Sequence, residues 1–215
     1  MRTGSYINGQ WHHPKSERLV RNINPADTKD VLAEFPAATA EDVHRAIGAA
    51  AAAFRDWKKT PGPERGRVIW RAADIARQRA DEIARTLTRE EGKILKEAKG
   101  EVLKGISLLE FYAGEGFRMH GKTLPSEARD TFTYTIRRPL GVVGLIAPWN
   151  FPWAIPVWKS APALVAGNTV VFKPAELTPA TASLMTEIYE QAGLPPGVFN
   201  MIVGSGSVAG EAIVN

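Results

Sequence analysis

Three polar side chains that could do chemistry follow two short apolar runs in the second half of the chain. Asn150 comes after the run over 142–147, and Lys173 and Glu176 come after the run over 169–172. A side-chain amide is a neutral donor that can stabilise an oxyanion as it develops on an attacked carbonyl. A carboxylate can accept hydrogen bonds from ribose hydroxyls, and a neighbouring lysine can reach the same sugar. These residue types indicate carbonyl chemistry beside a bound nucleotide.

The two apolar runs read as strands of a βαβ unit. After residue 141 strands and helices alternate, and they are expected over 142–147, 153–166, 169–172, 179–192, 199–203 and 206–214. Two buried strands joined by one crossover helix run parallel, and ligands bind beyond the ends of such strands. The alternation predicts an α/β fold with a doubly wound, parallel, Rossmann-like sheet, which residues 141–215 hold in part.

The first 121 residues predict a β ribbon followed by a layer of helices. Asn8-Gly9 is a hairpin-turn dipeptide inside an alternating segment. Thr39 and Asp42 have the spacing of a helix-capping box. Two more amphipathic helices are expected over 64–91 and 94–119. Three helices with apolar faces form a layer that needs a sheet to cover.

Residues 122–140 have a different pattern. Within them, 131–136 alternate Thr-Phe-Thr-Tyr-Thr-Ile, which suits a half-exposed strand. This strand lies between the helical layer and the parallel sheet without belonging to a βαβ unit. A protruding β ribbon is therefore predicted, with an ordinary edge strand as the alternative. Three parallel strands alone leave long edges unpaired, so the sheet and the chain are expected to be incomplete.

Five short motifs occur in order at compatible spacing. They are PWNFP at 148–152, WKSAPAL at 158–164, GN at 167–168, KPAE at 173–176 and GLPPGVFNMIVG at 193–204. With them the chain resembles the NAD(P)-dependent aldehyde dehydrogenase superfamily, from the YINGQW segment near its start to its last residue. The resemblance implies that the 122–140 ribbon is an oligomerisation arm, through which family members form homodimers or homotetramers.

The resemblance also implies roles for individual residues. Asn150 would donate to the oxyanion, and Lys159 would support proton transfer. Phe151 and Trp158 would line a tunnel for the aldehyde substrate. The cofactor-binding residues implied in this way are Ile146, Ala147, Pro148, Trp149, Lys173, Glu176 and Gly204. A carboxylate repels a 2′-phosphate and so favours NAD, whereas Lys173 offsets part of that repulsion and leaves room for NADP.

Each of these roles has a purely structural alternative. Asn150 could cap the helix that follows it. Lys173 and Glu176 could form a surface ion pair. Gly204 begins a GxGxxxG run, which could serve only as a strand-to-helix turn. Phe151 and Trp158 could belong to the core, where tryptophan is usually found.

Composition limits the classes of partner. The chain has 215 residues, 44% hydrophobic and 23% charged, as in an ordinary globular protein. Its net charge of +4 is spread over helices that also carry Glu and Asp, which indicates a solvated surface and no nucleic-acid partner. It contains no cysteine, and its four histidines lack the spacing of a metal site. No signal peptide or membrane span is visible, so a cytoplasmic protein without a membrane partner is expected.

The absence of cysteine limits what the chain does alone. Oxidation of an aldehyde through a covalent thiohemiacetal needs a thiolate, and the resemblance places the family's catalytic Cys and general-base Glu beyond residue 215. The chain is interpreted as an N-terminal fragment of an enzyme that oxidises an aldehyde to a carboxylate with NAD(P), inactive by itself. The alternative is a catalytically dead nucleotide-binding or assembly module of the same fold. Residues 24–39 resemble semialdehyde-oxidising branches of the family.

Overall fold

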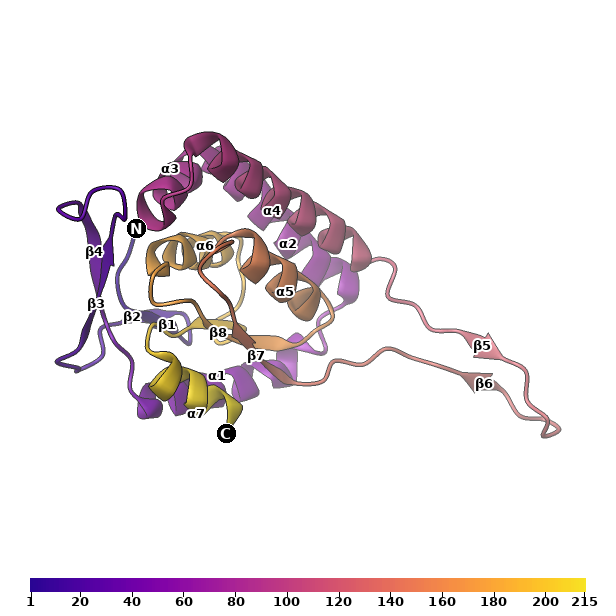
Figure 1. Cartoon of the computed structure of the whole chain (residues 1–215). Coiled ribbons are helices and arrows are strands. Elements are labelled where there is room, and N and C mark those ends of the chain that lie inside the picture. The colour runs from indigo at the N-terminus through magenta and orange to yellow at the C-terminus, as the bar shows by residue number, and fades with distance from the viewer.

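The computed structural model describes residues 1–215, and a mixed five-stranded sheet lies at its centre (Figure 1). The strand order is β2-β1-β9-β8-β7. Its parallel strands are β7 (Val142–Ile146), β8 (Thr169–Lys173) and β9 (Phe199–Met201). The crossover helices between them are α5 (Ala154–Val165) and α6 (Pro179–Gln191). The predicted α/β class with a Rossmann-like unit is confirmed.

An N-terminal hairpin closes the β9 edge of the parallel strands. It consists of β1 (Ser5–Ile7) and β2 (Gln10–His12), and Tyr6 pairs antiparallel with Met201. Asn8 and Gly9 adopt φ of 51° and 78°, as an Asn-Gly hairpin turn requires. One of the long edges expected to be unpaired is thus paired by the ribbon predicted at the N-terminus, whereas β7 lies at the edge of the sheet.

Helices cover both faces of this sheet (Figure 1). On one face lies α1 (Ala40–Trp57), together with the short α7 (Glu211–Val214) that follows the π-helical turn η1 (Gly206–Gly210). The expected capping box is present, because Thr39 N donates to Asp42 Oδ2 at 2.9 Å and Asp42 N donates to Thr39 Oγ1 at 3.3 Å. The other face is covered by α5 and α6.

Three further helices form an outer layer: α2 (Gly62–Gln78), α3 (Ala80–Glu91) and α4 (Leu95–Glu115). They pack on α5 and α6 and not directly on the sheet. Of the helices expected to cover a sheet, only the first, α1, does so. This arrangement explains why α6 is buried along most of its length. None of the helices has the length and apolar composition that crossing a bilayer requires.

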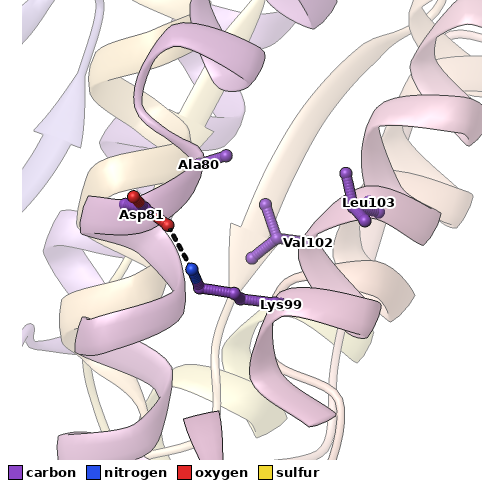
Figure 2. Close-up of a pocket in the computed structure, with 5 residues that line it drawn as sticks. All are labelled: Ala80, Asp81, Lys99, Val102 and Leu103. Atoms are coloured by element: carbon purple, nitrogen blue, oxygen red, sulfur yellow. Dashed lines mark ion pairs between the residues drawn. The ribbon is translucent and has the colours of Figure 1, made fainter. Parts of the chain in front are cut away.

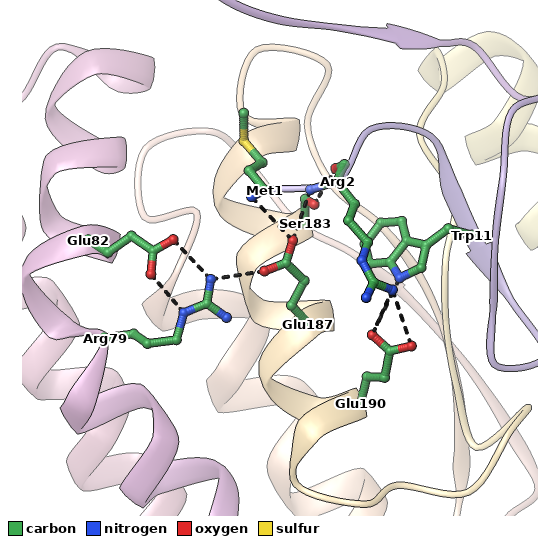
Figure 3. Close-up of polar contacts among 8 residues, drawn as sticks. All are labelled: Met1, Arg2, Trp11, Arg79, Glu82, Ser183, Glu187 and Glu190. Atoms are coloured by element: carbon green, nitrogen blue, oxygen red, sulfur yellow. Dashed lines mark hydrogen bonds and ion pairs between the residues drawn. The ribbon is translucent and has the colours of Figure 1, made fainter.

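The single helix expected over 64–91 is in fact two helices, separated at Arg79. Arg79 has φ of −100° and ψ of 13°, and neither glycine nor proline stands near the break. Its guanidinium donates to Glu82 at 2.7 Å and to the buried Glu187 of α6 at 2.9 Å (Figure 3). Glu187 also accepts from the backbone N–H of Arg2 at 2.9 Å. The break therefore directs a long side chain to a buried carboxylate that also holds the N-terminal segment.

Two hairpins lie outside the central sheet. One consists of β3 (Leu19–Ile23) and β4 (Val31–Pro36). The other, β5 (Thr123–Leu124) with β6 (Thr133–Tyr134), lies at the end of a long arm that protrudes from the body of the molecule (Figure 1). Large apolar side chains on this arm are exposed, including Phe132 at 75%.

The contact between α4 and α5 forms the part of the core nearest to the turn that bears Asn150. Trp153 is fully buried there, and its indole Nε1 donates to Val102 O at 3.2 Å. Gly105 lies directly against the ring, because a Cβ on Gly105 would come within 2.0 Å of Trp153 Nε1. Gly100, on the same helix, has open space where a Cβ would stand.

These two glycines of α4 predict opposite effects of the same substitution. Gly105→Ala should lower the free energy of unfolding by about 1–3 kcal/mol or more, because the ring of Trp153 has no room to move. Gly100→Ala should raise it by about 1 kcal/mol, because alanine is the better helix former. Urea unfolding followed by circular dichroism measures both. Equal effects of the two variants would contradict this packing.

Candidate functional site

The carboxyl ends of the three parallel strands meet at one edge of the sheet. Ile146 of β7 lies in register with Lys173 of β8, and Ala147 N donates to Lys173 O at 3.3 Å. Beyond β9, Gly204 O accepts from Lys173 Nζ at 3.3 Å. Residues that the sequence predicted for cofactor binding are therefore brought to the same edge from three different strands.

Lys173 is buried at this edge, with 5% of the residue exposed. Its ammonium also donates to Pro174 O at 2.7 Å. Burial lowers the pKa of Lys173, and the nearby carboxylate of Glu176 opposes that shift. The surface ion pair with Glu176 that the sequence left as an alternative is not formed. Lys173 instead links the end of β8 to the segment after β9.

Glu176 has a different partner, which the sequence did not indicate. Arg18 Nη2 lies 2.6 Å from Glu176 Oε1. Arg18 immediately precedes β3, so the pair joins the outer hairpin to the sheet edge across 158 residues of sequence. The side chain of Glu176 is 32% exposed and that of Arg18 is 55% exposed. A carboxylate is thus available at the edge, with a guanidinium beside it.

The GxGxxxG run forms a turn close to Lys173. A Cβ on Gly204 would lie 3.1 Å from Ala209 Cβ and 3.4 Å from Ala38 O, which is tighter than ordinary contact. The Ser205 hydroxyl accepts from Val208 N at 3.2 Å and so caps the turn. A Cβ on Gly206 would meet no atom within 4 Å. One glycine therefore serves close packing, while another leaves an open approach to the backbone.

Asn150 is exposed in the turn between β7 and α5, and its side chain makes no hydrogen bond. It does not cap α5, which begins at Ala154 after the cap residue Trp153. The alternative of a helix cap is therefore not supported. The amide is left free to donate to a molecule bound outside the turn.

A buried carboxylate of α4 takes the capping role instead. Glu101 Oε1 accepts from Trp153 N at 2.9 Å and from Ala154 N at 3.0 Å. Its side chain is 1% exposed. An anion is favourable at this position, because the first N–H groups of a helix are unpaired and carry partial positive charge. Glu101 therefore fixes the point at which α5 begins and the turn ends.

Lys93 holds the other side of the same turn. Its ammonium lies 2.6 Å from Glu101 Oε2 and donates to Asn150 O at 3.0 Å. It also lies 4.4 Å from the ring centroid of Phe151. Carboxylates at Glu91 and Glu101 raise the pKa of Lys93 against the opposing effect of burial. Neither Lys93 nor Glu101 was predicted as a site residue. Their one visible signal is an opposite charge eight positions apart, around the start of α4.

The remaining predicted residues lie on the surface near this turn. Phe151 and Trp158 are 47% and 50% exposed, so they are not core residues. Pro148 and Trp149 are exposed as well. Lys159 is exposed and donates to Ile146 O at 3.1 Å.

A cavity of about 320 Å³ lies beside the edge and is lined by residues that include Trp149, Leu177 and Glu90. Glu90 accepts from Ala180 N and Thr181 N at the start of α6, and burial raises its pKa to about 7. A smaller cavity of about 120 Å³ lies between α3 and α4, where Asp81 and Lys99 form a 2.8 Å ion pair (Figure 2). It contains none of the predicted site residues. No cluster of His, Cys, Asp or Glu could hold a metal ion.

The residues at the edge fit a nicotinamide dinucleotide. Glu176 presents a partly exposed carboxylate suited to ribose hydroxyls. Large apolar side chains on the segments at this edge are unusually exposed, among them Ile146 at 40%, Trp149 at 51% and Leu177 at 63%. Exposed apolar surface rimmed by polar groups marks ligand-binding grooves.

Comparison with known proteins gives one family. A model described as the aldehyde dehydrogenase family matches residues 11–215. Over 209 residues the chain is 51% identical to the alpha-ketoglutaric semialdehyde dehydrogenase of Bacillus subtilis. The alignment covers 97% of this chain and 43% of that relative. The chain thus spans less than half the length of this relative, and the matched portion is N-terminal.

Solved structures agree with this result. An NADP-dependent enzyme from E. coli superposes with a TM-score of 0.95 at 37% identity, over 98% of this chain and 44% of that one. An NAD-dependent benzaldehyde dehydrogenase from Corynebacterium glutamicum superposes with a TM-score of 0.93 at 38% identity, over 99% of this chain and 46% of that one.

Glu101 predicts a measurable effect on the turn that bears Asn150. In Glu101→Gln, amide hydrogen exchange at Trp153 and Ala154 should become about 10- to 100-fold faster, because hydrogen bonds to a charged acceptor contribute about 1.5–3 kcal/mol. Exchange measured by NMR gives the result directly. Glu97→Gln, an exposed position on the same helix, is the matched control. Unchanged exchange in the Glu101 variant would show that other contacts hold the turn.

Proposed function

The chain belongs to the aldehyde dehydrogenase family, and we propose that it supplies the cofactor site and the oxyanion donor of an enzyme that oxidises an aldehyde to a carboxylate with NAD or NADP. One observation carries the proposal: Lys173 ends one parallel strand, Glu176 follows it, and the free amide of Asn150 follows the neighbouring strand. Residues 1–121 and 141–215 would form the cofactor domain, and residues 122–140 the oligomerisation arm.

Asn150 would stabilise the oxyanion that forms when a nucleophile attacks the aldehyde. Its amide is exposed and unpaired, and Lys93 and Glu101 hold its turn on both sides. A hydrogen-bond donor that is already in position needs no free energy of reorganisation when negative charge develops on the oxygen. One such donor raises the rate by about 10²–10³-fold. The chain has no thiol, so the nucleophile of this reaction must come from residues outside it.

Bound NAD or NADP would accept the hydride. Glu176 would accept hydrogen bonds from the ribose hydroxyls, and Lys173 has a third ammonium proton available after donating to two carbonyls. Backbone at Ile146, Ala147 and Pro148, the ring of Trp149 and the turn at Gly204 would form the walls. The two solved structures named above are an NAD-dependent and an NADP-dependent enzyme, which fits use of either cofactor.

The aldehyde would enter along Phe151 and Trp158, which are half-exposed beside the turn, with Lys159 nearby supporting proton transfer. A semialdehyde is the substrate class that we propose, because the Bacillus subtilis relative bears that name at 51% identity. The protruding arm, with its exposed apolar side chains, suits assembly of two or four copies. The cytoplasmic location expected from the sequence stays a prediction.

A second candidate function has the same fold and no catalytic activity. The chain could be a catalytically dead nucleotide-binding or assembly module, which the complete absence of cysteine favours. Aldehyde oxidation distinguishes the two functions. If this chain is part of an enzyme, a protein that joins it to a thiol-bearing portion like that of its relatives should oxidise aldehydes.

Nucleotide binding by the purified chain tests the proposal. Titration with NAD should change the tryptophan fluorescence, because Trp149 is 51% exposed at the expected binding edge. A Trp149→Phe variant should lose most of the signal, while Trp70→Phe, at a half-exposed tryptophan of α2, should retain it. If circular dichroism shows that the chain is folded and calorimetry detects no heat of binding for NAD or NADP, the proposed cofactor site is refuted.

The oxyanion role of Asn150 predicts a separate kinetic effect. In an active enzyme containing this chain, Asn150→Ala should lower kcat by about 10²–10³-fold. The affinity for NAD should be unchanged, because the amide does not contact the ribose in the proposed arrangement. Steady-state kinetics with calorimetry separates the two quantities. A kcat within about threefold of the parent would remove Asn150 from the oxyanion site.

A further inference from the structure

Arg18 stands where the proposed cofactor site must distinguish NAD from NADP. Its guanidinium lies 2.6 Å from Glu176 Oε1, on the carboxylate that would accept the ribose hydroxyls. NADP differs from NAD in carrying a phosphate on one of those hydroxyls. A lone carboxylate repels that phosphate, so the partner of Glu176 decides how strong the repulsion is.

The β3–β4 hairpin fixes Arg18 over the sheet edge. The carbonyl of Arg18 accepts from Ala37 N at 2.9 Å, and the next residue, Ala38, donates to Val203 O at 2.7 Å. Further along the hairpin, the amide of Asn22 donates to Leu177 O at 2.9 Å. These bonds attach the hairpin on both sides of Glu176, to the segment after β9 and to the turn after β8. Arg18 is therefore held beside the edge by backbone contacts and does not reach it from a free loop.

Arg18 is 55% exposed and its guanidinium has no partner other than Glu176. An exposed ion pair contributes little to stability, so exchanging one oxygen acceptor for another costs little. A phosphate oxygen is an equally good acceptor, and a guanidinium binds it through two parallel hydrogen bonds.

Lys173 is less suited to this task. Its ammonium is buried and already donates to the carbonyls of Pro174 and Gly204. Burial also disfavours its charged form, which lowers its pKa. An arginine stays charged at every relevant pH. The cation that can meet an incoming phosphate is thus the one on the hairpin.

We propose that Arg18 is the specificity-determining residue that admits NADP to this site. With NAD bound, Arg18 stays paired with Glu176, whose other oxygen accepts from the ribose. With NADP bound, the guanidinium turns to the 2′-phosphate, donates to it and offsets part of its negative charge. The inference rests on the proposed function, because it concerns the same cofactor site.

The test is calorimetric titration of the purified chain with NAD and with NADP, for the parent and for Arg18→Gln. The variant should bind NADP about 10- to 100-fold more weakly, as expected for loss of hydrogen bonds from a charged donor to the phosphate. Its affinity for NAD should change by less than about threefold, since an exposed pair is worth little. Arg18→Lys should fall between the parent and the glutamine variant, because it keeps the charge and loses the paired donors.

Arg21→Gln is the matched control. Arg21 belongs to the same hairpin and pairs with Glu34 at 3.0 Å, with similar exposure of its side chain. The Arg21→Gln variant removes the same charge from the same region, so the ratio of the NAD affinity to the NADP affinity should be unchanged. Circular dichroism of each variant excludes unfolding as the cause of a change.

The outcomes separate the two proposals. Equal weakening of NAD and NADP in Arg18→Gln, or the same loss of NADP affinity in Arg21→Gln, would overturn the role of Arg18. A parent chain that binds NAD and not NADP would also overturn it, while leaving the cofactor site intact. A folded parent that binds neither nucleotide would overturn the proposed function and this inference together. Adenosine 2′,5′-bisphosphate and AMP, titrated in the same way, assign the difference to the phosphate alone.

Discussion

The buried carboxylate of Glu101 sets the geometry on which the rest of the site depends. It accepts from the first N–H groups of α5 and pairs with Lys93, which in turn holds the carbonyl of Asn150. A buried charge is costly unless its lone pairs are satisfied, and here three donors satisfy them. Because the carboxylate takes the capping position, Asn150 is released from it. A contact inside the helical layer thus leaves an amide free at the sheet edge.

Side chains at the proposed cofactor site also have partners other than their neighbours in sequence. Lys173 and Glu176 are close in sequence and look like a pair, yet Lys173 donates to the carbonyls of Pro174 and Gly204, and Glu176 pairs with Arg18. Lys173 binds carbonyls that belong to the ends of two strands, which fixes the edge. Glu176 pairs with Arg18, which directly precedes the β3–β4 hairpin. The edge therefore holds a buried cation, Lys173, and an exposed cation, Arg18, which pairs with Glu176.

Local patterns predicted much of this structure, and long-range contacts explain the rest. The alternation after residue 141, the Thr39 capping box and the Asn8-Gly9 turn each depend on neighbours in sequence, and the structure contains all three. The break at Arg79 and the pair between Arg18 and Glu176 depend on residues about a hundred or more positions away. Neither leaves a glycine, a proline or a periodic signal. The residues that touch the ligand in the proposed site were visible in the sequence, whereas those that hold them were not.

The pairing of β1 with β9 also bears on how the protein is made. Tyr6 and Met201 are neighbours in the sheet although they are 195 positions apart, as their residue numbers show. During synthesis the first hairpin emerges long before the strand that it joins, and its outer backbone groups wait without a partner. Strands that pair across such separations fold slowly, and unpaired edges invite aggregation meanwhile. The pairing of β1 with β9 is then a late step in folding, before which the unpaired edges of both strands are exposed.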